Sequence, residues 1–149
     1  VVTRNLIVLA HNLILLIPLQ FFSSLEISLI KILFFLLNLF FVGLIFSFVG
    51  IILGILSARY RDVPPTIANI TQVMFFMTPV LWMPSSIEGR KIGILILEFN
   101  PFNHILNAIR DPFINNIYIN INIIALLFFF SIIAFYLVGK YKQRIVMWV

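Results

Sequence analysis

The chain has 149 residues, of which 62% are hydrophobic and 10% are charged. A soluble domain carries about a quarter charged residues and under half apolar ones, so these side chains exceed what a soluble fold of this size can bury. The composition predicts an integral membrane protein. Its net charge of +5 does not indicate a nucleic-acid partner, because the basic residues lie between apolar runs and not on one polar face.

Four apolar runs are long enough to cross a bilayer, which takes about 20 residues with a range of about 17 to 25. They are residues 6–22, 32–56, 67–83 and 117–138. We expect each run to be a transmembrane helix, which makes the fold all-α. The third run lies between Pro64-Pro65 and Pro84, which serve as its boundaries.

The segment of residues 86–112 differs from these runs. Its apolar pieces, 92–97 and 104–109, are too short to span, and Asn100-Pro101-Phe102 separates them. Short apolar helices of this kind are typical of interfacial or re-entrant segments. Proline is tolerated at the start of a helix because its missing N–H has no partner there anyway. We therefore expect two short helices here, with Asn100-Pro101 ending the first and permitting the second to start.

The basic residues divide unequally between the two sides of the predicted membrane. One side receives a single acid, Asp62, and six basic residues: Arg4, Arg59, Arg61, Lys140, Lys142 and Arg144. The other side receives four acids and four basic residues: Glu26, Glu88, Glu98, Asp111, Lys31, Arg90, Lys91 and Arg110. Cytoplasmic loops carry the excess of Lys and Arg. We therefore place both ends of the chain, including the tail of residues 139–149, in the cytoplasm.

Two of the predicted spans carry a distinctive helical face. In the second span the small residues Gly43, Ser47, Gly50 and Gly54 share one face, which predicts close helix packing. In the third span a polar and aromatic stripe recurs at helical spacing: Asn69, Gln72 and Phe76. Two interpretations of this stripe remain open, hydrogen bonding to a neighbouring helix or the lining of a path for a hydroxyl-rich solute.

Catalytic patterns are missing from the sequence. No glycine-rich phosphate loop occurs, no His and Glu cluster has zinc spacing, and the carboxylates are scattered. A membrane-embedded glycosyltransferase or acyltransferase needs such a cluster and is disfavoured. A secondary transporter is disfavoured because no predicted span contains Asp, Glu or an internal Lys.

Several connecting segments, taken together, resemble the ABC-2-type exporter permeases. The signature stretch is Ser57-Ala58-Arg59-Tyr60-Arg61-Asp62-Val63, followed by a span that runs into Thr78-Pro79-Val80-Leu81-Trp82. Three further features resemble the polysaccharide and polyol-phosphate export branch of the family: Asn100-Pro101-Phe102, Arg110 and Lys142-Gln143-Arg144-Ile145-Val146-Met147-Trp148. Within that branch, two segments near the start of the chain resemble O-antigen exporters: Arg4-Asn5-Leu6-Ile7-Val8 and His11-Asn12.

The resemblance implies six spans per subunit, two membrane subunits and two separate ATPase subunits. This chain would then be N-terminally truncated and hold spans three to six. A lipid-linked glycan would pass from the cytoplasmic leaflet of the bacterial inner membrane along the interface between two permease copies. ATP-Mg would be bound by the partner ATPase, and this chain would bind no cofactor. A teichoic acid, a capsule chain or a small lipophilic molecule is an alternative cargo.

The resemblance also assigns candidate residues. The turn candidates, which would meet the ATPase side, are Arg59, Tyr60, Arg61 and Asp62; the alternative is simple charge anchoring of the two arginines. The re-entrant pair would lie on the outer side and close the exit, with Asn100, Pro101, Phe102 and Arg110 as gate residues. The alternative for these residues is a purely structural helix break.

Overall fold

A computed structural model gives the structure of residues 7, 8, 11, 14, 28–79, 82, 91–114 and 120–143. Between residues 28 and 143 the described residues form five helices: α3 (Leu29–Arg59), α4 (Val63–Met77), α5 (Lys91–Phe99), α6 (Pro101–Ile114) and α7 (Ile121–Tyr141). The described part of the chain contains no strand. The predicted all-α class is therefore confirmed for these residues.

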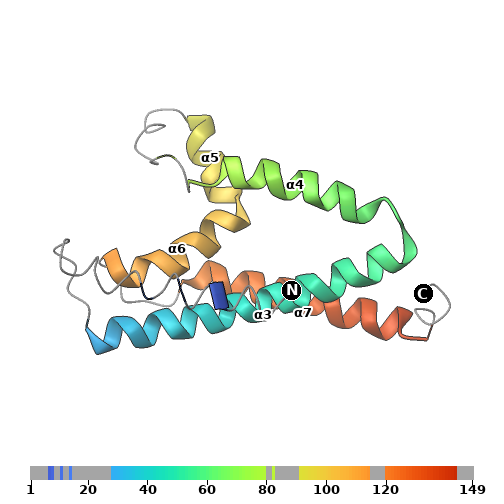
Figure 1. The fold of residues 1–149 in the computed structure, drawn as a ribbon, viewed down its shortest axis with the longest axis horizontal. Coiled ribbons are helices and arrows are strands. Elements are labelled where there is room, and N and C mark those ends of the chain that lie inside the picture. Colours follow the sequence, from blue (N-terminus) through green and yellow to red (C-terminus); the bar gives the residue numbers. More distant parts are fainter. Residues whose placement is uncertain are drawn as a thin grey trace.

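Helices α3 and α7 are long and apolar enough to cross a membrane. They contain 31 and 21 residues, and only 17% and 11% of their most apolar windows are buried. The core helix of a soluble protein would be mostly buried, so these exposed apolar faces suit a lipid environment. The two helices run in the same direction side by side (Figure 1), with the rings of Phe48 and Phe135 5.9 Å apart.

Helix α4 has 15 residues and is about 22 Å long at 1.5 Å per residue, less than the bilayer core of about 30 Å. Pro64 and Pro65 do not precede the helix, as the sequence suggested, but form its first turn, where their missing N–H groups leave no bond unmade. The helix ends at Met77 because Pro79 forces the residue before it, Thr78, into an extended conformation.

The predicted count of four spans stays a prediction. Two helices of the described residues meet the length of a span, and the predicted first span, 6–22, lies outside the described residues except for 7, 8, 11 and 14. The described helices of the segment predicted to be re-entrant are α5 and α6, which break at Asn100 as expected.

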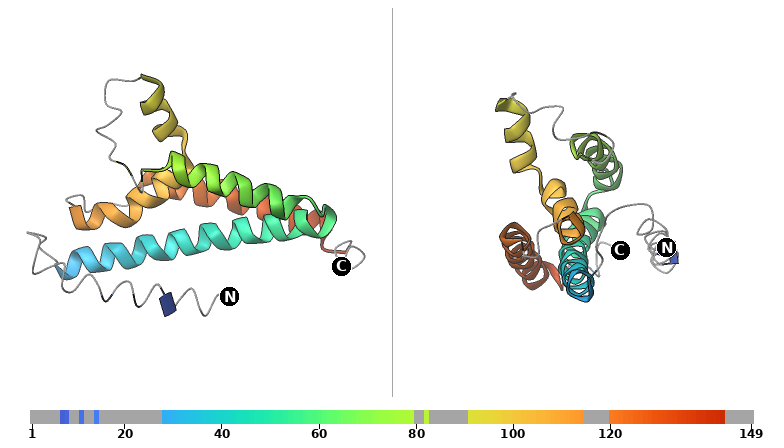
Figure 2. Two further views of the ribbon diagram at one scale, coloured as in Figure 1. Left: turned by 45° about the horizontal axis from the view of Figure 1, so that its top comes forward. Right: turned by 90° about the vertical axis from the view of Figure 1, so that its left-hand side faces the viewer.

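Helix α6 lies against α3 and runs antiparallel to it (Figures 1 and 2). Its last turn places Phe113 beside Phe35 near the start of α3, with ring centroids 5.1 Å apart. Earlier in α6, Ala108 joins a buried cluster with Val42 and Ile45 of α3 and Ile123 of α7. We call α3, α6 and α7 the three-helix body because this cluster is their shared core.

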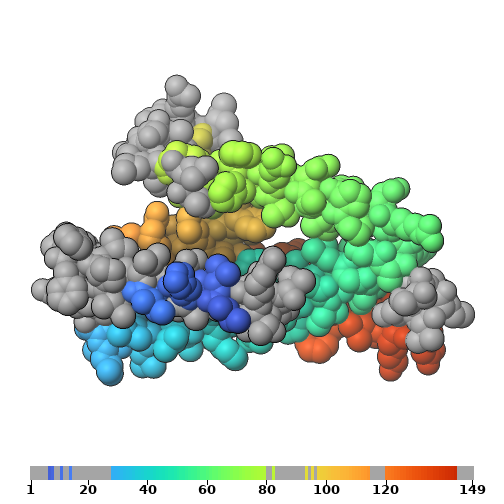
Figure 3. Space-filling view, in the orientation of Figure 1, coloured from blue at the N-terminus to red at the C-terminus, as the bar shows by residue number. Residues whose placement is uncertain are grey.

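Helix α4 stands apart from the three-helix body. No residue of α4 itself is buried among the described residues. A hollow separates it from α3 along part of its length, while the two helices meet at the turn that joins them (Figure 3). Within the described part of the chain, α4 is therefore attached mainly at its two ends.

Candidate functional site

The break between α5 and α6, which we call the elbow, is built from polar side chains that satisfy the helix ends. Asn103 donates from Nδ2 to the carbonyl of Leu97 at 3.0 Å. His104 donates from Nε2 to the carbonyl of Glu98 at 2.7 Å. These carbonyls lie in the last turn of α5, where helices leave acceptors without intrahelical partners. The first turn of α6 thereby caps the last turn of α5.

Asn100 connects the elbow to α4. Its Oδ1 accepts from the N–H of Phe102 at 3.0 Å and so caps α6. Its Nδ2 donates to Oγ1 of Thr78 at 3.1 Å, and that hydroxyl donates to the carbonyl of Met74 at 2.7 Å. Both Asn100 and Thr78 are 4% exposed, so each polar group is matched inside the protein as a low-dielectric setting requires.

His104 connects the elbow to α7. Nδ2 of Asn122 lies 3.2 Å from Nδ1 of the imidazole. Because a carbonyl only accepts, the Glu98 carbonyl fixes the ring proton on Nε2. The neutral ring then has Nδ1 free to accept from the amide of Asn122. One imidazole thus joins the ends of α5, α6 and α7.

Asn38 connects α3 to α6 at a point where proline leaves a carbonyl free. Pro112 lies inside α6 and has no N–H to donate to the carbonyl of Ala108, four residues earlier. Nδ2 of Asn38 donates to this carbonyl at 2.8 Å. Neighbouring helices commonly satisfy carbonyls that proline frees in membrane helices. Asn38 is 1% exposed, and none of the sequence motifs described above includes it.

The depth of the elbow along α3 follows from these contacts. Ile105 packs against the cluster that contains Val42 and Ile45, whereas Phe113 lies beside Phe35 near the start of α3. Helix α6 therefore begins beside the middle of α3 and ends near its first turns. Non-helical backbone at such a depth is tolerated in a bilayer only where protein or an aqueous cavity surrounds it, and the buried, bonded Asn100 fits this requirement.

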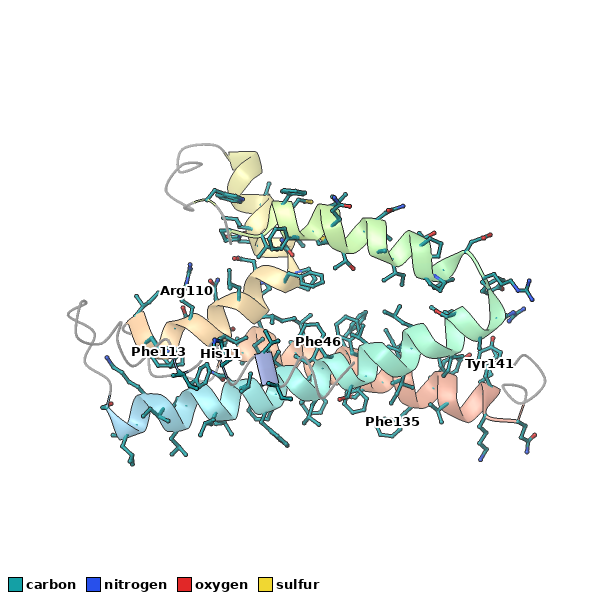
Figure 4. The ribbon with its side chains drawn as sticks, in the orientation of Figure 1. His11, Phe46, Arg110, Phe113, Phe135 and Tyr141 are labelled. Carbon is teal, nitrogen blue, oxygen red and sulfur yellow. The ribbon has the colours of Figure 1, made fainter. Side chains whose placement is uncertain are left out.

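The predicted gate residues are only partly brought together. Asn100, Pro101 and Phe102 form the elbow itself. Arg110 lies more than two turns farther along α6, donates to Oδ1 of Asn107 at 3.1 Å, and points away from α3 whereas Phe113 points toward it (Figure 4). Its Nε is buried without a partner among the described residues.

The stripe predicted on α4 is exposed along its whole length. Asn69, Gln72 and Phe76 are all exposed, and neither amide has a hydrogen-bond partner in the described part of the chain. The threonines of the same helix behave differently, since Thr66 and Thr71 donate to the carbonyls of Asp62 and Ile67. Within the described residues, these two amides are therefore the polar side chains of α4 that have no hydrogen-bond partner, and Phe76 adds an aromatic face that is 61% exposed.

The turn between α3 and α4 consists of Tyr60, Arg61 and Asp62. The N–H of Tyr60 caps α3 by donating to the carbonyl of Leu56 at 2.8 Å, and the guanidinium of Arg59 lies 5.1 Å from the Tyr60 ring centroid. The turn residues are exposed. Together with Arg59 at the end of α3, the turn places two basic side chains and one acidic one at the same end of the bundle as Tyr141 and the end of α7 (Figure 4).

The small-residue face of α3 has no described neighbour. A Cβ added at Gly43, Gly50 or Gly54 would meet nothing within 4 Å, and the Ser47 hydroxyl donates to its own helix at the Gly43 carbonyl. The contacts of α3 within the three-helix body use another face. Close packing by the small-residue face therefore stays a prediction.

A cleft of about 400 Å³ opens where the elbow meets α7. Its polar lining consists of Glu98, His104 and Asn122, and its apolar lining includes Phe99 and Phe129, which are 81% and 57% exposed. The cleft combines aromatic faces with hydrogen-bonding groups. Within the described residues, no group of three or more His, Cys, Asp or Glu side chains is placed to hold a metal ion.

The chain was compared with known protein families and structures. The family model described as ABC-2 type transporter matches residues 1–114, a range that includes helices α3, α4, α5 and α6. Comparison with curated proteins and with solved structures finds no match. The family match covers 114 of the 149 residues, and two apolar helices of spanning length accompany it. The chain therefore belongs to the ABC-2 type transporter family of membrane components.

Proposed function

We propose that this chain is the permease subunit of an ATP-driven exporter that moves a lipid-linked, O-antigen-like polysaccharide across the bacterial cytoplasmic membrane. Family membership supports the permease class. The observation that supports this cargo is the stripe of α4. The exposed amides of Asn69 and Gln72 have no hydrogen-bond partner among the described residues, and Phe76 is exposed on the same helix. Amides that donate and accept next to an aromatic face suit a hydroxyl-rich chain.

The energy source in this proposal is a separate ATP-binding subunit that holds ATP-Mg. The sequence has no phosphate-binding loop of its own, and members of the family work with an ATP-binding partner. A partner can drive transport only if its nucleotide states favour different arrangements of the permease helices. The exposed turn of Tyr60, Arg61 and Asp62 is the surface we assign to that contact.

The proposed assembly contains two copies of the permease, and this chain supplies spans three to six of six. The end that carries Arg59, Arg61 and Lys140 faces the cytoplasm, in line with the positive-inside rule. The elbow of α5 and α6 then enters from the outer side and closes the exit. The glycan passes along the interface between the copies.

The function is tested by expressing the complete protein with the ATP-binding subunit encoded beside it. We expect the two to copurify in detergent and to restore surface glycan in a strain that lacks the permease. Asn69→Leu combined with Gln72→Leu removes both free amides. Thr71→Val is the matched control on the same helix, because its hydroxyl already bonds to its own backbone.

Two hydrogen bonds to cargo contribute about 1–3 kcal/mol together, so we expect the double variant to slow export about 5- to 150-fold and Thr71→Val to leave it unchanged. Normal glycan export by a properly inserted double variant would contradict the role of the stripe. Copurification without export of an O-antigen-like glycan, together with transport of a teichoic acid, a capsule chain or a lipophilic molecule, would replace the cargo but keep the permease.

A further inference from the structure

The attachment of α4 differs in kind from that of the other long helices. Helices α3, α6 and α7 share a buried core, with Ile45, Ala108 and Ile123 each at most 1% exposed. No residue of α4 is buried in the part of the chain that the structure describes. Its ties within that part lie at its ends, in the short turn from α3 and in the contact beyond Met77.

Among the described residues, the hydrogen bond that ties the far end of α4 to the elbow runs between side chains, from Nδ2 of Asn100 to Oγ1 of Thr78 at 3.1 Å. Each of the two side chains keeps another hydrogen bond when this one opens. Without this bond Thr78 still donates to the carbonyl of Met74, and Oδ1 of Asn100 still caps Phe102. One amide N–H alone loses its partner.

The contact between α6, which begins at the elbow, and α3 is stronger than the contact between Thr78 and Asn100. Separating α6 from α3 would break the bond from Asn38 to the Ala108 carbonyl and leave that carbonyl unpaired, because Pro112 cannot donate to it. It would also expose the cluster that Ala108 shares with Val42 and Ile45. Buried unpaired groups are costly to create, so the elbow stays with α3 when α4 moves.

From this difference we propose that α4 is a lever that pivots on the turn of Tyr60, Arg61 and Asp62, with the hydrogen bond between Thr78 and Asn100 as its latch. When the latch opens, α4 swings relative to the three-helix body while α3, α6 and α7 keep their mutual packing. A push on the exposed turn moves the far end of α4 away from the elbow. The inference rests on the proposed function only in linking this motion to export.

The latch is tested first by distance measurements that need no transport. The chain has no native cysteine, so spin labels can be placed at Phe46→Cys on α3 with Val73→Cys on α4, and at Phe46→Cys with Ile132→Cys on α7. All three positions are at least 50% exposed. The complete protein is measured in lipid nanodiscs by pulsed electron resonance, with Thr78→Val to remove the latch acceptor and Thr71→Val as the matched control.

We expect Thr78→Val to broaden or shift the distances between α3 and α4 and to leave the distances between α3 and α7 unchanged. Thr71→Val should change neither. Unchanged distances between α3 and α4 in Thr78→Val would overturn the lever, as would an equal change between α3 and α7. Because no export is measured, this result stands whatever the cargo proves to be.

The link to export is tested by closing the latch covalently. Thr78→Cys with Asn100→Cys, joined by a short bifunctional thiol reagent that a reductant cleaves, should stop export until reductant is added. The control pair, Val42→Cys with Ile123→Cys, lies in the shared core and should export when joined. If the unmodified protein exports and the joined latch pair exports at the rate of its reduced form, the link between lever motion and export is refuted. If the unmodified protein does not export, the proposed function is refuted instead.

Discussion

Asn38 takes the place of the backbone donor that Pro112 removes from α6. The change Asn38→Leu keeps a side chain of similar size and deletes the amide that donates to the Ala108 carbonyl at 2.8 Å. In the native background that carbonyl then has no donor, because Pro112 has no N–H. In a Pro112→Ala background residue 112 regains its N–H and bonds to the same carbonyl, so Asn38 becomes dispensable.

The size of the effect is set by two opposing terms. An unpaired buried carbonyl costs about 1–3 kcal/mol. Part of this is recovered because Oδ1 of Asn38 is itself buried without a partner among the described residues, and leucine removes that atom. We expect a net loss of about 1 kcal/mol, which lies between the average of about 0.6 kcal/mol and the maximum of about 1.7 kcal/mol for side-chain hydrogen bonds between membrane helices.

The assay is a double-mutant cycle on the free energy of unfolding, measured by denaturing-detergent titration in mixed micelles. Asn38→Leu should destabilise the native background by about 1 kcal/mol and should be neutral or stabilising with Pro112→Ala, a coupling above the scatter of about 0.3–0.5 kcal/mol expected for independent sites. The cycle cancels the lost packing of the buried Pro112 ring. Equal effects of Asn38→Leu in both backgrounds would refute the replacement-donor argument.

Three further predictions concern the turn, the small-residue face and the elbow. Charge reversal by Arg61→Glu should lower export severalfold without changing membrane insertion, checked by surface glycan and membrane fractionation; full export would remove the turn from the functional surfaces. Gly50→Leu should stabilise the isolated chain by about 0.5–1 kcal/mol through helix propensity, since a Cβ added at Gly50 meets nothing within 4 Å. The same change should weaken any association between copies through the small-residue face, which the crosslinking yield between tagged copies would measure. Asn103→Ala should uncap the Leu97 carbonyl and cost about 1 kcal/mol; an unchanged unfolding free energy would show that the elbow does not need this cap.

The long apolar helices were predictable because hydropathy depends on composition over a window. The runs 32–56 and 117–138 fall within or largely overlap α3 and α7, and the break at Asn100 follows from the fixed geometry of Pro101. Helix ends were less predictable. Pro64-Pro65 suits both the residues before a helix and its first turn, and only the structure distinguishes the two.

The polar contacts were not predictable from local pattern. Asn38 and Ala108 are 70 residues apart in sequence, and Asn100 and Thr78 are 22 apart, so periodicity carries no signal for either pair. Two hints were nevertheless present. Asn38 interrupts an apolar run, and a polar side chain in lipid needs a hydrogen-bond partner. Pro112 lies inside a helical pattern, which implies that the carbonyl four residues earlier lacks its usual backbone donor.

The imidazole of His104 bonds to the main chain of residue 98 and not to its side-chain carboxylate. Its partner is the Glu98 carbonyl at 2.7 Å, an atom that every amino acid supplies. The side chain at this position, which lines the cleft beside α7, can therefore be exchanged for a neutral or basic one while the bend between the short helices keeps its shape. The charge that lines the cleft can therefore change through substitutions at residue 98 while the hydrogen bond that holds the elbow is kept.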